Sequence, residues 1–490
     1  MFKRSFTRLS NNLVIKGTII LTITGLATRF IGFYNRIFLS NLIGARELGI
    51  YQLIFPLYMV AFSLTTMGNE LALTKLVSEY IKRNEYKSAL AFFKTCFVIN
   101  LLSGSLTALI FFTKADYMSA KLLNAPSCSS CLKIISLGIP FMAMKGAVHG
   151  FFLGLERSDV HGISDFLEQT MKVSCIYIIS LCFSSTIKLN ASFAVCGIVI
   201  GEVISFIYSV IMLFIELNKR KADDKTYKAN TMAILPEKNI SLFFKNALPL
   251  TANRFALTLL TSTEAILIPT ILLKFYHSSA ASLEIYGIFT GMSFPFIMFP
   301  ATITNSLSIM LLPAVSGASS SLNKTYISRL CEKSISFCLI IGIISGSTFF
   351  IYGKLIGNLF FNNKEAGIFL YQLSLLCPLI YLATTIASIL NGLGHASHNL
   401  LLTVLSTGIR IGFILFAIPR IGITGYIIGL FCGYLFLSLT SMKKLNETVD
   451  FKLKFTKNIL IPLLLSLSAE ILLYILLNLQ FANLFPMRLS

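Results

Sequence analysis

The sequence predicts an all-α membrane protein with about 13 (12–14) transmembrane helices, in which two parallel-related six-helix bundles surround a central cavity. Of its 490 residues, 55% are hydrophobic and only 13% are charged. Soluble domains carry about 25% charged residues, so a water-facing surface cannot be built and a soluble enzyme is excluded. Apolar stretches of roughly 20 residues recur along nearly the whole chain, and a helix of that length spans the ~30 Å hydrocarbon layer. An internal repeat divides these stretches into two sets of six.

The individual elements follow from the apolar stretches in chain order. Several exceed about 20 residues, which allows a helix to tilt in the bilayer but fixes no angle. The segment 481–490 is too short to cross again, so the two termini are expected on opposite sides of the membrane. The predicted spans are 12–40, 48–73, 88–112, 131–154, 159–184, 190–216, 243–274, 284–313, 333–357, 367–391, 397–418, 422–441 and 458–480.

The basic residues predict the orientation. A formal charge of +20 in a soluble protein raises the question of nucleic acid, but here the charges lie in loops, which fits the positive-inside bias and an anionic lipid surface. Lys and Arg gather in the amino-terminal segment and in the loops on its side of the membrane. We therefore expect a multi-pass protein of the cytoplasmic membrane with a cytoplasmic amino terminus and no nucleic-acid partner. The basic start, Met1 to Ser10, precedes an apolar stretch too long for a signal peptide, so it is expected to remain with the first helix.

A repeat with an offset of 238 residues predicts the domain organisation. Its strongest match is Pro140 with Pro378, each followed fourteen residues later by Gly-Leu. Six spans separate the copies, an even number, so the halves are expected to point the same way through the membrane. The predicted organisation is a six-helix bundle at 1–217, a basic linker at 218–242, a second six-helix bundle at 243–441 and an appended helix at 442–490.

Prolines inside the spans are candidate hinges for rocking of the two bundles. A proline within a helix leaves a carbonyl without its usual partner, which neighbouring helices or cavity water must satisfy. The alternative interpretation is a set of static kinks. The candidates are Pro56, Pro140, Pro249, Pro269 and Pro378.

Charged residues at membrane depth are the candidate site, because they are costly in lipid and normally face a cavity or a partner. Arg29 and Arg36 lie seven residues apart, on one helical face with Asn35 nearby. Two guanidinium groups facing one compartment would form an anion site suited to phosphate oxygens. The alternative is that Arg36 extends to the membrane surface and that Arg29 pairs with a carboxylate.

The remaining intramembrane charges are candidates for substrate binding, coupling or charge pairing. Lys145 with His149, and Asp165 with Glu168 and Lys172, each line one helical face, which predicts either a cavity wall or an interhelical salt-bridge network. A second offset of 235 residues, at which Leu48 recurs as Leu283, aligns Glu264 of the seventh span with Arg29 and would permit a pair between the bundles. The substrate-binding candidates of this group are Arg254 and Lys145, and the coupling or charge-pair candidates are Glu264, Glu70, Asp165, Glu168, Glu202 and Arg410.

No catalytic, cofactor or metal motif is found. There is no Walker loop, no HExxH and no Ser-His-Asp pattern, so the expectation is a protein that is not an enzyme and has no cofactor or metal site. Cys128 and Cys131 form a CxxC without a second pair or a histidine cluster, and two free thiols are expected, with a disulfide as the alternative.

Several motifs resemble the stage V sporulation protein B family of the multidrug/oligosaccharidyl-lipid/polysaccharide exporter superfamily. They are Arg29 to Arg36, continuing through Leu42-Ile43-Gly44 to Phe55-Pro56, then Leu76 to Glu79, Gly146 to Arg157, Glu264 to Pro269 and Tyr286 to Met292. The resemblance implies a flippase for an undecaprenyl-linked glycan, with a peptidoglycan or spore cortex precursor as the expected cargo. It also implies a fold like that of multidrug exporters and lipid II flippases.

The sequence departs from that family in places. Asn35-Arg36 stands where related lipid II flippases have an Arg-Asp pair, so the charged site of those relatives does not carry over intact. Arg29 and Arg254 fall at basic positions of the resemblance and are the substrate-binding residues that it implies best. Glu70 belongs to Gly68-Asn69-Glu70, which replaces a Gly-Ile-Pro. Many relatives have fourteen spans.

Three functions are compared. In the leading hypothesis, cavity arginines bind the diphosphate of a lipid-linked glycan, the bundles rock, and the lipid tail stays in the bilayer. The alternative of the same fold is a cation-coupled multidrug exporter that depends on embedded carboxylates. A third is a non-transporting scaffold that recruits cell-wall synthesis proteins.

Overall fold

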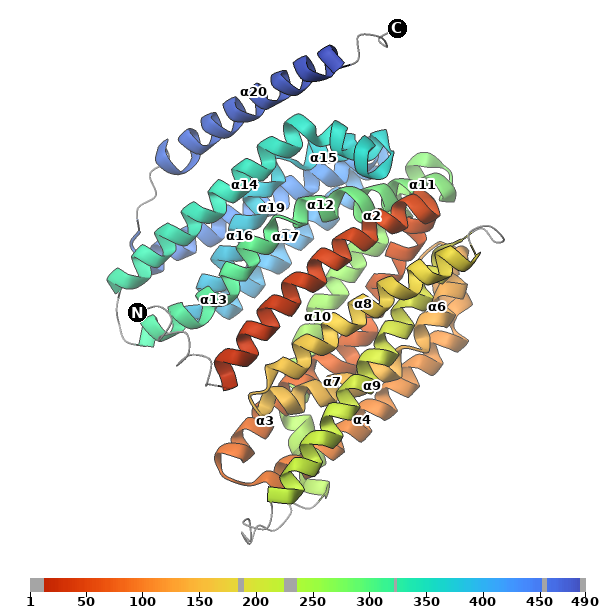
Figure 1. Cartoon of the computed structure of the whole chain (residues 1–490), viewed down its shortest axis with the longest axis vertical. Coiled ribbons are helices and arrows are strands. Elements are labelled where there is room, and N and C mark those ends of the chain that lie inside the picture. Colours follow the sequence, from red (N-terminus) through yellow and green to blue (C-terminus); the bar gives the residue numbers. More distant parts are fainter. Residues whose placement is uncertain (1–12, 184–188, 224–235, 321–323, 452–455, 485–490) are drawn as a thin grey trace. The chain divides into compact units, whose positions relative to one another are not determined.

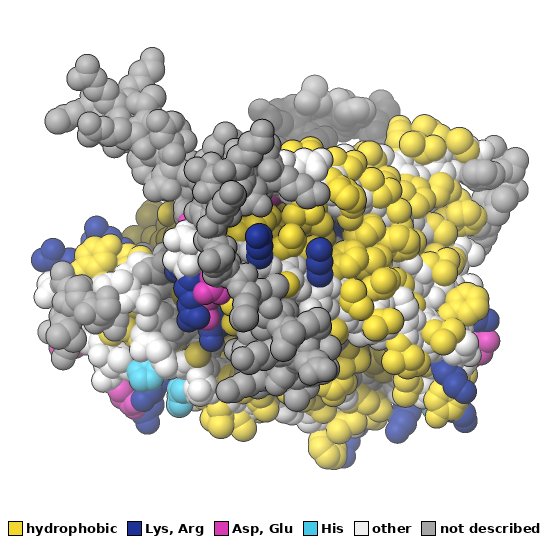
Figure 2. Space-filling view, turned by 90° about the horizontal axis from the view of Figure 1, so that it is seen from below, with side chains coloured by type: hydrophobic (Ala, Val, Ile, Leu, Met, Phe, Trp, Pro, Cys, Tyr) yellow, Lys and Arg dark blue, Asp and Glu magenta, His cyan; other side chains and the backbone are white. Residues whose placement is uncertain are grey.

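The computed structural model of the chain describes residues 13–183, 189–223, 236–320, 324–451 and 456–484 (Figure 1). These residues are almost entirely helical and contain no β-strand, which confirms the predicted fold class. Hydrophobic side chains cover much of the surface seen in Figure 2, as expected of a lipid-facing exterior.

The backbone divides into two compact units, residues 1–266 and 267–490. The dividing point lies within α10, beyond the predicted linker 218–242, of which residues 224–235 are outside the described part. The N-terminal unit contains α2 (Leu13–Phe62), η1 (Ser63–Met67), α3 (Gly68–Lys82), α4 (Tyr86–Thr113), α5 (Ala115–Tyr117), η2 (Met118–Leu122), η3 (Pro126–Cys128), α6 (Ser129–Ser136), α7 (Ile139–Gly154), α8 (Ser158–Phe183), α9 (Ala191–Asp223) and most of α10 (Pro236–Tyr276).

The C-terminal unit continues with a similar series of helices. They are α11 (Ser279–Gly287), η5 (Ile288–Ser293), α12 (Phe294–Met298), α13 (Ala301–Ser320), α14 (Lys324–Phe361), α15 (Lys364–Leu373), α16 (Leu376–Gly392), α17 (Ala396–Phe416), α18 (Ile418–Ile421), α19 (Ile423–Thr448), η6 (Thr456–Leu460) and α20 (Ile461–Leu484).

The predicted count of thirteen spans is not confirmed. Within the described residues, ten helices are long and apolar enough to cross a membrane, or up to twelve if each of two bent pairs is one span. The first two predicted spans merge into one helical run, Ile20–Lys82, which bends at Gly44, where φ is 80°. The predicted span 284–313 is broken instead, into Ser279–Met298 and Ala301–Ala318. Apolar length alone does not show where a helix bends or stops.

The sequence repeat has a local counterpart in each unit. In the first, α6 and α7 form a pair bent by 46°, and in the second, α15 and α16 form a pair bent by 55°. Pro140 and Pro378 lie in the first turn after each bend, where a proline costs no helical hydrogen bond. A Cβ on Gly104 would lie 3.2 Å from Pro140 Cα, and one on Gly342 would lie 2.5 Å from Pro378 Cα. Both contacts therefore recur at the same 238-residue offset.

The other hinge candidates lie inside long helices. Pro56 is within α2, and its own carbonyl accepts a hydrogen bond from the Ser262 hydroxyl at 2.9 Å, which connects this part of α2 to α10. Pro249 and Pro269 lie within α10. Movement at any of these prolines stays a prediction.

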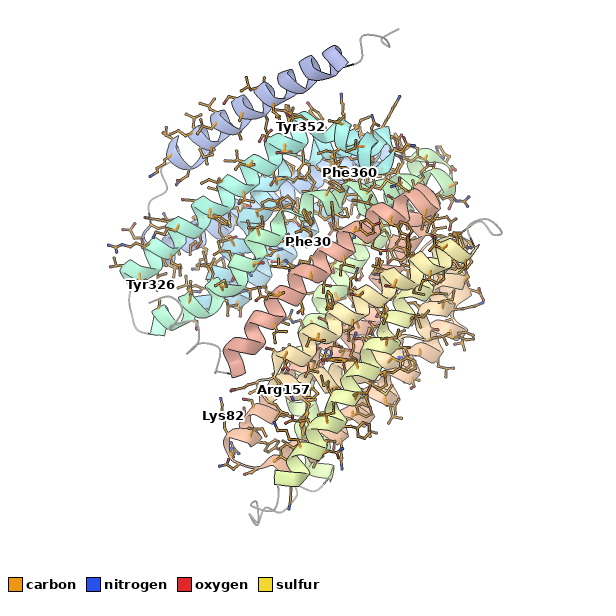
Figure 3. All side chains as sticks on the ribbon, in the orientation of Figure 1. Phe30, Lys82, Arg157, Tyr326, Tyr352 and Phe360 are labelled. Carbon is orange, nitrogen blue, oxygen red and sulfur yellow. The ribbon has the colours of Figure 1, made fainter. Side chains whose placement is uncertain are left out.

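The core of the N-terminal unit is aromatic and aliphatic. Phe92 and Phe93 of α4 pack with Phe151 and Phe152 of α7 and with Val77 of α3, all of them buried. The basic turn residue Arg157, which follows α7, and Lys82, at the end of α3, lie at the same end of this unit (Figure 3).

The last helix, α20, packs on α14 through polar contacts. The Glu470 carboxylate accepts hydrogen bonds from the hydroxyls of Ser347 and Thr348 at 3.0 and 2.8 Å, and the Tyr352 hydroxyl donates to the Glu470 carbonyl at 2.8 Å. One oxygen of this carboxylate is thus bound by two hydroxyls of α14, and a third hydroxyl of α14 binds the Glu470 backbone carbonyl. This supports a structural role for Glu470.

The two cysteines of the CxxC motif are free and buried, at η3 and α6. The Cys131 thiol lies 3.4 Å from the Ser192 hydroxyl. The expectation of two free thiols is confirmed.

Candidate functional site: a charged cavity in the N-terminal unit

A cavity of about 330 Å³ lies inside the N-terminal unit. It is notable for its charge, because Lys145 and four carboxylates line it together with two histidines. The lining residues are Thr28, Tyr58, Met59 and Phe62 of α2, Thr66 of η1, Glu70 of α3, Met142, Lys145, Gly146 and His149 of α7, His161, Asp165, Glu168 and Gln169 of α8, and Glu202 of α9.

Lys145 occupies one half of the cavity and is held between two carboxylates. Its Nζ lies 2.5 Å from Glu168 Oε2 and 2.6 Å from Glu202 Oε2. The Tyr58 hydroxyl donates to the other oxygen of Glu202 at 2.7 Å. The side chains of Lys145 and Glu202 are only 8% and 6% exposed, so this network is withdrawn from solvent and ties α2, α7, α8 and α9 together.

Two histidines and two further carboxylates occupy the other half. His161 lies between carboxylates, with Nδ1 3.3 Å from Asp165 Oδ2 and Nε2 3.7 Å from Glu70 Oε1. Its ring stacks on that of His149, with 4.4 Å between the ring centroids. The Ser209 hydroxyl lies 3.4 Å from His149 Nε2 and belongs to a buried group of hydroxyls with Ser164.

Three glycines on one face of α7 allow α3 to pack closely against that helix. Gly146, Gly150 and Gly154 recur every four residues, so they share one face of the helix. A Cβ on Gly146 would meet Thr66 at 2.1 Å, and one on Gly150 would lie 2.8 Å from the Glu70 carbonyl oxygen. Their lack of a side chain brings Glu70 beside α7 and hence near His149.

The polar contacts of α3 fix it further. Asn69 donates to the side-chain oxygen of Asn100 at 2.8 Å, and Asn100 donates to the Ala143 carbonyl at 2.9 Å. Both amides are buried, and Asn69 is the residue directly before Glu70. The Gly68-Asn69-Glu70 departure noted in the sequence therefore supplies both a helix anchor and a cavity carboxylate.

The cavity is acidic. Four carboxylates face one lysine, which gives a formal charge of −3 with both histidines neutral and −2 with one of them protonated. Ionised groups away from water need partners. In one half the carboxylates share the Lys145 charge, whereas in the other half only the histidines oppose Glu70 and Asp165. That half has the capacity to take up a cation.

The structure brings together five of the predicted site residues and leaves the others outside the cavity lining. Those brought together are Lys145, Glu70, Asp165, Glu168 and Glu202. Arg29 and Arg254 are exposed, Arg36 is half-buried, and Asn35 and Glu264 are buried at other positions of the N-terminal unit. Arg410 belongs to the C-terminal unit, where it donates to the Thr407 hydroxyl at 3.0 Å and lies over the Tyr434 ring. The predicted arginine-lined cavity stays a prediction.

Two members of the polar network in the cavity, His161 and Tyr58, are not among the residues that the sequence analysis selects. His161 lies four residues before Asp165 and seven before Glu168, so the helical spacing carried a signal for it. Tyr58 lies in an apolar stretch, and no pattern there indicates its bond to Glu202, 144 residues away.

The charged groups are specific to the first half of the repeat. With the offset of 238 residues, Lys145 and His149 correspond to Ala383 and Ala387 in α16, and His161 corresponds to Asn399 in α17. The second unit forms the same bent pair without these charges. The fold therefore does not require them, which supports a functional role.

Solved structures with similar folds are transporters. An inward-facing multidrug resistance MATE family transporter of the MOP superfamily has a TM-score of 0.62 and 13% identity, over 86% of this chain and 95% of that chain. An outward-facing structure of such a transporter has a TM-score of 0.62 and 12% identity, over 90% of this chain and 96% of that chain.

Fold and site together define a multi-pass, all-helical membrane protein built like the MOP superfamily transporters. The chain belongs to the polysaccharide biosynthesis protein family, whose model matches residues 14–319.

Two curated relatives come from Bacillus subtilis (strain 168). Stage V sporulation protein B is 24% identical over 450 residues, covering 90% of this chain and 85% of that protein. A lipid II flippase is 22% identical over 368 residues, covering 70% of this chain and 66% of that protein. These similarities confirm the resemblance predicted from the motifs.

Proposed function

We propose that the protein is a flippase of the cytoplasmic membrane that translocates an undecaprenyl-diphosphate-linked glycan, a precursor of peptidoglycan or polysaccharide. The observation that carries the proposal is family membership over residues 14–319, joined to the similarity to a lipid II flippase over 70% of the chain. The basic loops favour a cytoplasmic amino terminus.

Exposed arginines in apolar helices provide the anion contacts. Arg29 and Arg254 lie in candidate membrane spans and are exposed in the structure. A guanidinium is costly against lipid, so these side chains need water or an anion as a neighbour. Each would form charge-assisted, bidentate contacts to phosphate oxygens without covalent chemistry.

The second candidate function is a cation-coupled multidrug exporter. It is favoured by the excess of carboxylates over cations in the cavity, where Glu70 and Glu202 are both present. In this alternative, the carboxylates bind a cationic substrate or a coupling ion, and the exposed arginines are not required.

Binding measurements distinguish the two candidates. We expect the purified protein to bind an undecaprenyl-diphosphate-linked sugar, and the Arg29→Ala/Arg254→Ala variant to bind it about 10- to 100-fold more weakly for each lost contact. Arg83→Ala, in the exposed turn after α3, is the matched control and should leave the affinity unchanged. The same binding measurement is made with a cationic dye on the wild type, on Arg29→Ala/Arg254→Ala and on Glu70→Gln/Glu202→Gln.

Two other outcomes have clear meanings. Dye binding that survives loss of both arginines but fails in Glu70→Gln/Glu202→Gln would assign the protein to the drug exporters. No binding of either ligand, together with full complementation by the arginine variant, would support the scaffold that recruits wall-synthesis proteins.

A further inference from the structure

We propose that Glu70, His149 and His161 form a binding site for a divalent transition-metal ion, with Zn²⁺ as the probe ion. The inference concerns the half of the cavity that lacks Lys145, and it does not depend on which substrate the protein carries. One ligand atom from each of the three residues lies within 4.8 Å of the others. The residues come from α3, α7 and α8, so an ion would connect three helices.

The set of donors suits such an ion. Two imidazole nitrogens and one carboxylate oxygen are ligands that zinc uses in four-coordinate sites, with the fourth position taken by water. The adjoining cavity of about 330 Å³ has room for that water. Tetrahedral bonds of 2.0–2.1 Å place ligand atoms about 3.3 Å apart. Because the three ligand atoms now lie within 4.8 Å of one another, they must approach one another only slightly to close the site.

Asp165 lies close enough to His161 to supply the outer support that histidine ligands require. Histidines that bind metals usually donate their second ring N–H to a carboxylate, which fixes the ring and raises its basicity. Asp165 Oδ2 lies 3.3 Å from His161 Nδ1, whereas His161 Nε2 points toward Glu70 Oε1 at 3.7 Å. His161 Nδ1 has no hydrogen bond among the described residues, so a small ring rotation would form the bond to Asp165 while Nε2 faces the site. On the other side, the buried Ser209 hydroxyl, at 3.4 Å, orients the His149 ring.

The charge balance favours a dication. Lys145, the nearest cation, is already held by Glu168 and Glu202 at 2.5 and 2.6 Å. Glu70 and Asp165 therefore place two negative charges beside the histidine pair, and Lys145, the one lysine or arginine among the residues that line the cavity, is bound to the other two carboxylates. A divalent ion would balance both charges and satisfy the stacked imidazoles at once.

The site also has no counterpart in the second half of the repeat. The position that corresponds to His149 is Ala387, and the one that corresponds to His161 is Asn399. Because the bent pair forms there without histidines, the pair in the first unit is not needed to build the fold. Metal binding explains why two imidazoles and Glu70 converge at this one place.

Metal titration of the full-length protein in detergent tests the proposal. We expect one Zn²⁺ per chain by calorimetry, an increase in melting temperature on addition of Zn²⁺, and the visible absorption of tetrahedral Co²⁺ when that ion replaces it. Glu70→Gln and His149→Ala/His161→Ala should abolish all three signals. Asp165→Asn should weaken binding about 10- to 100-fold.

The control variants are His395→Ala and His398→Ala, at the start of α17 in the other unit, and they should bind like the wild type. Equal binding by all variants, or no binding of Zn²⁺ and Co²⁺ by folded wild-type protein, would overturn the proposal. Glu70→Gln and Asp165→Asn preserve side-chain shape, so a folding defect in the histidine variant does not decide the test. Since no glycan is present, a failure here leaves the proposed flippase function unaffected.

Discussion

Replacing Lys145 with methionine is expected to destabilise the N-terminal unit by about 3–5 kcal/mol and to abolish function. Lys145 is the cation between Glu168 and Glu202, and its removal leaves buried carboxylates facing each other without compensation. Taking away one partner of a buried ion pair is far more costly than replacing the whole group. The melting temperature of the purified protein in detergent measures the effect.

An exposed lysine provides the matched control. Lys133 pairs with Asp116 at 2.9 Å, but these side chains are 39% and 73% exposed. The Ser129 hydroxyl and Lys133 lower the pKa of Asp116, which remains solvated when the lysine is removed. Lys133→Met should therefore leave the melting temperature nearly unchanged, because exposed ion pairs contribute little. Adding Glu168→Gln and Glu202→Gln to Lys145→Met should recover much of the lost stability, because no buried charge is then left unpaired. Equal melting temperatures for Lys145→Met and Lys133→Met would contradict the buried network.

The second large effect is expected at Gly357. A Cβ there would lie 2.2 Å from the Gly367 nitrogen and 2.4 Å from its Cα, so the added atom meets backbone that cannot rotate away. Gly357→Ala should force α14 and α15 apart at a cost of at least about 1–3 kcal/mol and lower the yield of folded protein. Size-exclusion chromatography and the melting temperature report both effects.

Glycines without close neighbours are the controls for this prediction. A Cβ on Gly408 or Gly412, both in α17, has nothing within 4 Å. Gly408→Ala and Gly412→Ala should leave the melting temperature unchanged or slightly higher, because alanine favours a helix. If Gly357→Ala behaves like these two variants, α14 and α15 do not approach as closely as the structure indicates.

The fold class could be predicted because it depends on composition and length. The repeat was also visible, and its strongest match, Pro140 with Pro378, marks the bent pairs that both units contain. The number of spans could not be predicted in the same way. Whether the chain bends, as at Gly44, or breaks, as after Met298, depends on local packing that hydropathy does not describe.

The candidate site could be predicted in part. Charges at membrane depth identified Lys145 and Glu202, but the sequence does not show which helical faces meet, so their ion pair was not foreseen. Position on the helix also matters. Thr28 lines the cavity, whereas the next residue, Arg29, is exposed, because consecutive residues point about 100° apart.

The most direct test of the central claim is movement of the proposed substrate across a bilayer. Purified protein is reconstituted into vesicles that contain a fluorescent undecaprenyl-diphosphate-linked sugar, and an impermeant quencher reports the outward-facing fraction over time. The flippase proposal predicts faster exchange than in protein-free vesicles, a loss of that acceleration in Arg29→Ala/Arg254→Ala, and wild-type rates in Arg83→Ala. Folded wild-type protein that leaves the rate at the protein-free level, with or without an ion gradient, would contradict it.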